Sequence, residues 1–263
     1  MRVGVNSRLL LKDKLEGIGY FTLKNLERLA KNHPDCEFVL FFDRPYDRDF
    51  VFAKNVKPIV ISLPTRHPML WHIYFEILLP IYIRLYKIDV LFSPEGYIPT
   101  RVKSPMLCTI HDINFEHDKT YIGNRVYQRY MEYFTPRFAK SANAVLTVSE
   151  FSKQDIATTY KIDENKIFNV ESSANEEYVT YSKEENERTR ESNSCPYFYF
   201  VGSLQKRKNL TNLFRAFDLF KDKTQSNVKL LIVGSKKWWK GEIEDTFNAM
   251  RFRNEVVFTG RLP

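Results

Sequence analysis

Residues 38–42 of this chain read Phe-Val-Leu-Phe-Phe, and Asp43 closes the run. Five consecutive apolar residues that end at a carboxylate are typical of a β-strand buried on both faces, as the strands of parallel sheets are. Working outward, strands of the same kind are expected at residues 1–5, 59–63, 90–92, 106–110 and 144–148. Apolar residues at helical spacing lie between them, over residues 21–31, 73–86, 125–140 and 151–160. This alternation predicts an α/β fold with a doubly wound parallel sheet.

The composition changes at residues 181–194, which read YSKEENERTRESNS and contain no aliphatic side chain. Such a stretch buries too little to offset the entropy of ordering it, so we expect an exposed linker. The pattern then resumes, with strands expected at 197–201, 228–233 and 256–258 and helices at 209–221 and 242–250. We therefore expect an N-terminal Rossmann-like domain over 1–180, a linker over 181–194, and a partial second domain over 195–263. Three strands are the first half of such a domain, and the third is expected to have an open edge.

Composition excludes several classes of protein. The chain has 263 residues, is 43% hydrophobic and carries 40 Lys+Arg against 32 Asp+Glu, a formal charge of +8. These values exclude a disordered or fibrous protein. The three cysteines, Cys36, Cys108 and Cys195, are far apart, which argues against a disulfide framework or a structural zinc site and favours a reducing, cytoplasmic compartment. No nucleic-acid-binding motif accompanies the positive charge.

The most apolar segment, residues 71–92, contains Glu76, Arg84, Lys87 and Asp89, so it is not expected to span a bilayer. Two interpretations of the aromatic and basic part of it, His67–Lys87, stay open. It is either a core helix that packs on the sheet or a surface that rests on a membrane, where a lipid-linked acceptor would be found.

Glycines and a histidine mark two candidate sites in the first domain. Gly17 and Gly19 precede the helix expected from Phe21, where free amides favour an anion, although a plain glycine turn would look the same. His111 and Asp112 follow a buried strand, and ligands of parallel sheets bind at the carboxyl ends of the strands. A structural histidine is the alternative. His117 has no third ligand at a convincing spacing, so no metal site is expected.

Two further stretches combine a strand end with a helix start. Ser149, with Glu150 and Ser152 after it, fits the N-cap of a helix and lacks the surroundings of a serine nucleophile. The sequence Lys206-Arg207-Lys208 follows a strand and Gly202 and precedes a helix. Cations beside a helix N-terminus suit a phosphate, whereas a solvated charged face is the alternative.

These motifs, in this order, resemble the family 4 glycosyltransferases of the GT-B fold. The matching stretches are Gly-Ile-Gly-Tyr at 17–20, Trp71, Glu76, Leu-Pro at 79–80, Asp-Val-Leu-Phe-Ser-Pro at 89–94, Thr-Ile-His-Asp at 109–112, Val-Ser-Glu-Phe-Ser-Lys at 148–153, Val-Gly-Ser-Leu at 201–204 and Arg-Lys-Asn-Leu at 207–210. The resemblance implies an N-terminal domain that takes the acceptor and a C-terminal domain that takes a nucleotide-diphosphate sugar. It implies a retaining transferase that needs no metal and no cofactor and acts on a saccharide or lipid-linked glycan.

The resemblance also implies roles for individual residues. His111 would be the catalytic-site histidine beside the donor sugar, and the donor diphosphate would be bound by Gly17, Gly19, Gly202, Arg207 and Lys208. Asp112, Ser149, Glu150 and Ser152 would line the cleft between the domains. Ser203 departs from the family, in which an arginine is common at that position.

The family's Glu-x7-Glu element, which binds the donor, would lie beyond Pro263. We therefore expect weak or absent activity from this chain, whose second domain is either truncated or completed by another chain. The alternative is a non-catalytic remnant or subunit that binds acceptor or nucleotide and needs a partner chain. A nucleotide-sugar epimerase of the same architecture fits the motifs around His111 and Ser149 less well.

Overall fold

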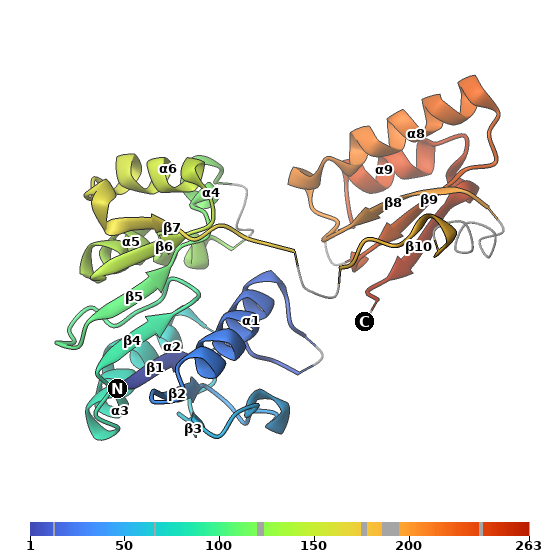
Figure 1. Cartoon of the computed structure of the whole chain (residues 1–263). Helices are drawn as coiled ribbons and strands as arrows, with labels where there is room; N and C mark the ends of the chain where they lie inside the picture. The colour runs from blue at the N-terminus through green and yellow to red at the C-terminus, as the bar shows by residue number, and fades with distance from the viewer. Residues whose placement is uncertain are drawn as a thin grey trace. The chain divides into compact units, whose positions relative to one another are not determined.

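The computed structural model describes residues 1–12, 14–65, 67–119, 124–174, 178–185, 195–236 and 239–262. The chain divides into two compact units, Met1–Ala174 and Asn175–Pro263. Each unit contains its own parallel sheet (Figure 1). Of the predicted linker, residues 186–194 lie outside the described residues, and residues 181–185 are exposed.

The first unit is built on seven parallel strands in the order β3-β2-β1-β4-β5-β6-β7. The strands are β1 Arg2–Asn6, β2 Glu37–Phe42, β3 Val56–Val60, β4 Val90–Ser93, β5 Met106–Thr109, β6 Ala144–Thr147 and β7 Ile167–Asn169. This order confirms the predicted doubly wound fold. In the centre of the sheet, Val5 of β1 pairs with Leu40 on one side and with Phe92 on the other.

Two strands differ from the sequence prediction. β3 lies three residues earlier than the predicted run 59–63, because Phe38 of β2 pairs with Val56 and Phe42 with Val60. The run therefore includes Pro58, which a strand tolerates here because β3 is at the edge of the sheet. β7 was not predicted, since it is only three residues long.

Helices cover both faces of this sheet. They are α1 Gly17–Asn32, α2 Pro68–Ile73, a π-helical segment η2 Tyr74–Leu78, α3 Leu79–Leu85, α4 Asn114–His117, α5 Arg125–Ser141 and α6 Glu150–Tyr160, with single 3₁₀ turns η1 Arg48–Phe50 and η3 Glu164–Lys166. The helix predicted from residue 73 begins at Pro68, where the His67 ring accepts a hydrogen bond from the Met69 amide and proline suits the first turn.

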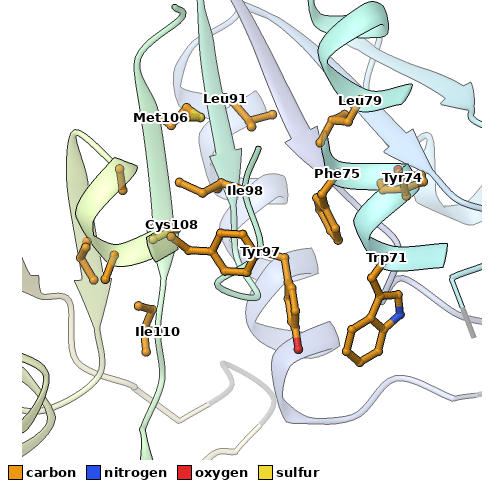
Figure 2. Packing of buried hydrophobic residues seen from close by; sticks show 14 of the residues in the cluster. Trp71, Tyr74, Phe75, Leu79, Leu91, Tyr97, Ile98, Met106, Cys108 and Ile110 are labelled. Carbon is orange, nitrogen blue, oxygen red and sulfur yellow. The ribbon is translucent and has the colours of Figure 1, made fainter. Parts of the chain in front are cut away.

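Two apolar clusters lie on opposite faces of the sheet. On one face, Leu26 and Ala30 of α1 pack with Val5 and Leu40. On the other, aromatic residues of α2 and η2 pack with residues of β4, β5, α5 and α6, and Figure 2 shows Trp71, Phe75 and Leu79 on this side of the strands. Because both faces are covered, the middle residues of the central strands are apolar, as the sequence suggested, and polar residues occur at the strand ends.

The second unit has three parallel strands in the order β10-β9-β8. Its elements are β8 Tyr197–Val201, a 3₁₀ turn η4 Lys206–Lys208, α8 Leu210–Thr224, β9 Lys229–Val233, α9 Glu242–Ala249, a 3₁₀ turn η6 Arg253–Glu255 and β10 Val256–Gly260. Both helices lie on the same face of the sheet (Figure 1) and share one apolar cluster with it, centred on Phe214 and Ile232. β10 is at an edge, as expected, and β8 is at the other edge.

The three cysteines are free thiols in different surroundings. Cys36 and Cys195 are partly exposed, whereas Cys108 is buried in β5, and burial raises the pKa of its thiol to about 12. Among the described residues, no helix combines the length and the apolar character that crossing a bilayer requires.

Candidate active site

The first unit has one point at which the direction of the sheet connections reverses. From β1 the chain continues through α1 to β2 on one side, and later returns to β4 on the other side of β1. In open α/β sheets, ligands bind outside the carboxyl ends of the strands at such a switch point. The residues that follow β1 and β4 therefore define where a site is expected.

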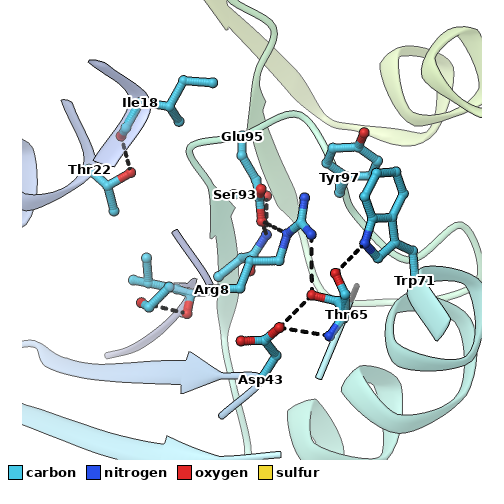
Figure 3. Close-up of polar contacts among 12 residues, drawn as sticks. Arg8, Ile18, Thr22, Asp43, Thr65, Trp71, Ser93, Glu95 and Tyr97 are labelled. Atoms are coloured by element: carbon cyan, nitrogen blue, oxygen red, sulfur yellow. Dashed lines mark hydrogen bonds and ion pairs between the residues drawn. The ribbon is translucent and has the colours of Figure 1, made fainter. Parts of the chain in front are cut away.

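A network of polar side chains occupies this place (Figure 3). The Asn6 side-chain amide at the end of β1 donates to Ser93 Oγ at 3.0 Å and to Glu95 Oε1 at 2.5 Å, just after β4. Arg8 donates through Nε to the same Glu95 oxygen at 2.5 Å. The side chains of Arg8 and Glu95 are only 9% and 2% exposed, so this is a buried ion pair.

Aromatic rings and a second carboxylate complete the surroundings of Arg8. Its guanidinium carbon lies 5.0 Å from the ring centre of Trp71 and 4.9 Å from that of Tyr97. Its Nη1 donates to Thr65 Oγ1 at 3.2 Å, and Thr65 donates in turn to Asp43 after β2. Burial alone would lower the pKa of Arg8, but the adjoining Glu95 outweighs this and the pKa lies above its ordinary value. Arg8 is therefore a permanently charged group held at the switch point.

Asp43 is ionised for a similar reason. Burial would raise the pKa of this carboxyl, but hydrogen bonds from Arg44 and Thr65 hold the pKa below its ordinary value. The network thus combines two cations, Arg8 and Arg44, with two carboxylates. Its charges balance inside the protein, as a buried cluster requires.

Several buried oxygens at this edge of the sheet have no hydrogen-bond partner among the described residues. They are Asn6 Oδ1, Glu95 Oε2, Thr109 Oγ1 and Thr147 Oγ1. All belong to the last residue of a strand or to the turn that follows one, namely β1, β4, β5 and β6. Since nearly all buried polar groups in proteins are satisfied, such a concentration marks this edge as the place where a water molecule or a ligand would supply the partners.

His111 lies at the same edge, after β5. Its Nε2 is 3.0 Å from the carbonyl oxygen of Pro94, which can only accept, so Nε2 carries the proton. Burial lowers the pKa of His111 despite that hydrogen bond and the nearby Asp112. The ring is therefore neutral at pH 7, with Nδ1 as its hydrogen-bond acceptor.

The ion pair and the histidine are connected through one turn of the chain. Pro94 and Glu95 are neighbours, so the Arg8–Glu95 pair fixes the carbonyl to which His111 donates. The next residue, Gly96, has φ of +81°, and a side chain there would approach the Thr109 carbonyl oxygen to 3.3 Å. Arg8, Glu95 and Gly96 together set the orientation of the His111 ring.

The glycine pair predicted as a loop is the first turn of a helix. α1 begins at Gly17 and not at Phe21, and the His111 ring contacts Phe21 edge-on with 4.9 Å between ring centres. A side chain at Gly19 would come within 2.9 Å of the Leu15 side chain, whereas one at Gly17 would meet nothing within 4 Å. Packing thus explains Gly19, and the structure brings the start of α1 beside His111.

The other predicted residues of this unit make local hydrogen bonds. Asp112 accepts from the Asn114 amide at 3.1 Å, and Ser149 caps α6 by accepting from the Ser152 amide at 3.1 Å. Glu150 accepts from the Asn169 side chain at 2.9 Å. The capping role predicted for Ser149 is thereby confirmed. His117 pairs with Asp155 at 2.8 Å.

The second unit carries the predicted basic turn between β8 and α8. Gly202 follows β8, has φ of +150° and lies directly beside Gly234, which follows β9. Lys206, Arg207 and Lys208 form the exposed turn η4, and Arg207 Nε donates to Gln205 Oε1 at 3.0 Å. The first turn of α8 follows, with no side-chain cap on its amides. Cations and uncapped amides are therefore adjacent, as the sequence predicted.

Sequence reasoning did not identify Asn6, Arg8, Asp43, Thr65 and Glu95 as site residues. A signal was present for three of them, because Asn6, Asp43 and Glu95 each end or closely follow an apolar run. Polar residues after three neighbouring strands point to one edge of a sheet. Arg8 and Thr65 also belong to this polar network. Their positions depend on loop conformations, which the spacing of residues in the sequence does not reveal.

Comparisons with known proteins agree with this architecture. Residues 15–170 match the model of Glycosyltransferase Family 4, and residues 182–263 match that of Glycosyl transferases group 1. The chain is 26% identical over 243 residues to O-antigen chain mannosyltransferase B of Escherichia coli, which covers 87% of this chain and 63% of the relative. It therefore spans less than two thirds of the length of that relative.

Solved structures share the fold at low identity. The lipopolysaccharide glycosyltransferase WaaG matches all of this chain and 70% of its own, with a TM-score of 0.67 at 11% identity. HepE of Anabaena, solved in complex with UDP-glucose, gives the same coverages with a TM-score of 0.66 at 12% identity. The GT-B class predicted from the motifs is confirmed. With more than half of its residues matched by one family model, the chain belongs to glycosyltransferase family 4.

Proposed function

We propose that this chain transfers a sugar from a nucleotide-diphosphate sugar to a saccharide or lipid-linked glycan, with retention of the anomeric configuration. The observation that carries the proposal is the neutral His111, fixed at the switch point of the first sheet beside a buried polar network. Membership of family 4 supports the transferase class. A mannosyltransferase relative and a neighbour bound to UDP-glucose support a hexose on a nucleotide carrier.

In this proposal His111 orients the donor sugar. With Nε2–H donated to Pro94, the neutral ring offers Nδ1 as an acceptor to a sugar hydroxyl. A protonated ring would have no acceptor nitrogen, so burial keeps the group in the useful state. His111 thus binds and positions the donor next to its anomeric carbon.

The second unit neutralises the leaving group. As the bond to the sugar breaks, negative charge grows on the diphosphate, and cations that face it stabilise the transition state. Arg207 and Lys208, next to the amides at the start of α8, are assigned this role. The Gly202 amide donates to the Val233 carbonyl at 3.0 Å, so it is not assigned to the diphosphate. With these groups in place, the diphosphate needs no metal ion. Gly17 of the first unit is proposed as a further backbone contact to the donor.

Isothermal titration against a panel of UDP- and GDP-sugars tests donor binding. We expect one member of the panel to bind, and Lys208→Ala to weaken its affinity about tenfold, since a charge-assisted hydrogen bond to phosphate is lost. Lys223→Ala, an exposed lysine at the other end of α8, is the matched control and should leave affinity unchanged. If no nucleotide sugar binds, or if both lysine variants behave alike, the donor assignment is wrong.

A turnover assay tests the chemistry. His111→Asn keeps a side chain of similar polarity and should lower kcat more than it lowers donor affinity. Proton NMR of the product gives its anomeric configuration. An inverted product would contradict the retaining mechanism while leaving the transferase assignment intact.

A second candidate function is a subunit that works only with a partner chain. It is favoured by β8, whose outer edge has no partner among the described strands. Donor binding by the isolated chain without turnover would support this candidate over the first.

A further inference from the structure

The continuous helical run from Pro68 to Leu85 has an apolar outer face. Five large apolar side chains at intervals of four residues stay exposed, with between 37% and 69% of each accessible. They are Met69, Ile73, Ile77, Ile81 and Leu85, here called the outer stripe. Monomeric proteins rarely leave contiguous apolar surface of this kind exposed unless it binds something.

The outer stripe lies opposite the face that packs on the sheet. Trp71, Phe75, Leu79 and Ile83, each two residues after a member of the stripe, are buried in the core. Figure 2 shows Trp71, Phe75 and Leu79 on the strand side of the helix. Two residues along a helix correspond to about 200° of rotation, so the stripe points away from the sheet.

The π-helical segment reduces the winding of the stripe around the helix axis. In a regular α-helix each four-residue step overshoots a full turn by about 40°, so five residues at this spacing would wind about 160° around the axis. The wider turns of Tyr74–Leu78 need more residues each, which cancels part of this drift. The exposed apolar residues therefore stay on one side of the run, and the buried ones lie on its other side.

Cations accompany the stripe. Arg84 and Lys87 are exposed at its end. Near its middle, Glu76 accepts hydrogen bonds from the backbone and hydroxyl of Thr100, which brings the exposed Arg101 and Lys103 alongside the helix. The one carboxylate within the run is thereby engaged. Beyond the run, Asp89 is exposed and accepts from the Arg2 amide at 2.7 Å, so cations outnumber carboxylates beside the stripe.

We propose that the outer stripe binds the surface of an anionic lipid bilayer, with its apolar side chains in the headgroup region and its cations against lipid phosphates. An apolar helix face flanked by Lys and Arg has the chemistry of an interfacial helix. A second copy of the chain fits less well, because face-to-face pairing would place like charges opposite one another. The inference goes beyond the proposed transferase function and requires neither donor nor acceptor.

Vesicle sedimentation with the full chain tests this surface. We expect binding to vesicles of phosphatidylcholine with added phosphatidylglycerol, weaker binding to phosphatidylcholine alone, and release at high salt. Ile81→Gln should weaken binding about fivefold and Ile77→Gln/Ile81→Gln about twenty-fold, because each isoleucine has roughly half of its surface left to bury. Leu219→Gln, on α8 with 55% exposure against 53% for Ile81, is the matched control and should bind as the unchanged chain does.

A second pair of substitutions separates charge from apolar contact. Arg84→Gln/Lys87→Gln should reduce the preference for anionic vesicles and leave binding to neutral ones unchanged. Circular dichroism of each variant verifies that it is folded. The proposal is overturned by absent binding to anionic vesicles at low salt, by equal losses in Ile81→Gln and Leu219→Gln, or by a dimer that Ile81→Gln dissociates.

Discussion

β1 and β8 hold the same place in their units, yet their surroundings differ. Each is the first strand, and each is followed by a helix and then by a parallel neighbour on one side. β1 also pairs with β4 on its other side, and its Val5 is fully buried. Among the described strands, β8 pairs only with β9, and Tyr197, Phe198, Tyr199 and Val201 are between 44% and 71% exposed.

The two sheets differ in the same way. Two apolar clusters cover the two faces of the first sheet, whereas one cluster covers one face of the second. An apolar run such as Tyr197–Val201 has the composition of a central strand, but neighbours and not composition decide whether it is buried. We therefore expect the first unit to dominate the stability of the chain, and the following experiments compare the two units.

The largest difference is expected from a charge placed in each first strand. Val5→Asp buries an unpaired carboxylate and should cost at least about 5 kcal/mol, enough to unfold the first unit. Tyr199→Asp, at a position 71% exposed, should cost less than about 1 kcal/mol. Urea unfolding followed by circular dichroism measures both. Equal losses would mean that β8 is covered in solution, and the comparison would fail.

Ion pairs provide the second comparison. Arg8→Met leaves Glu95 charged and buried and should cost about 3–5 kcal/mol. Arg251→Met removes an exposed pair with Asp222 in the second unit and should cost under about 1 kcal/mol. Arg8→Met/Glu95→Gln should recover part of the loss in thermal unfolding. A mild effect of Arg8→Met alone would show that water reaches Glu95.

For glycine substitutions, the larger loss of stability is expected in the second unit. A methyl group at Gly234 in the second unit would lie 2.0 Å from the Gly202 carbonyl oxygen, so Gly234→Ala should cost about 2–4 kcal/mol. Gly17→Ala in the first unit meets nothing within 4 Å and should change stability by less than about 1 kcal/mol. If Gly17→Ala weakens nucleotide-sugar binding at unchanged stability, the glycine is required by the ligand. Unchanged binding would remove Gly17 from the site.

Protonation of a histidine at acidic pH is expected to give the smallest change in the free energy of unfolding. This change is expected in the first unit alone. All five histidines lie in residues 1–174. Burial lowers the pKa of His111, so below its ordinary value of 6.5 the unfolded chain takes up a proton that the folded chain resists. The free energy of unfolding should therefore fall as pH decreases from 7.5 towards and through that lowered pKa. His111→Asn should reduce this slope, measured by urea unfolding at several pH values, and an unchanged slope would contradict the assignment.

Much of this architecture could be predicted from the sequence because buried parallel strands and their helices leave strong periodic patterns. The strand at Tyr197–Val201 has the predicted bounds, and those at 37–42, 90–93 and 144–147 are within one residue of them. The start of α1 was missed because Gly17 and Gly19 suggest a turn, although both are compatible with a first helical turn. The predicted position of β3 was three residues too late, because pairing with β2, and not apolar content, sets the register of this strand.

The candidate site was less predictable. His111 was identified from its place after a strand, but its tautomer depends on the Pro94 carbonyl and its neutral state on burial. The Arg8–Glu95 pair joins residues 87 positions apart, a contact that no local pattern encodes. For the segment His67–Lys87 the sequence left a core helix and a membrane surface open. The four-residue spacing of the outer stripe matches that of the buried face, and only packing distinguishes the two.

Two of the three thiols are partly exposed and lie in different units, so they can serve as labelling sites for spectroscopy. Cys36 belongs to the first unit and Cys195 to the second, both within reach of solvent, whereas Cys108 stays protonated inside β5 and resists maleimides. Donor and acceptor dyes can thus be attached to the unmodified chain, one on each unit. Energy transfer between them would report directly on any movement that a nucleotide sugar or a lipid vesicle induces.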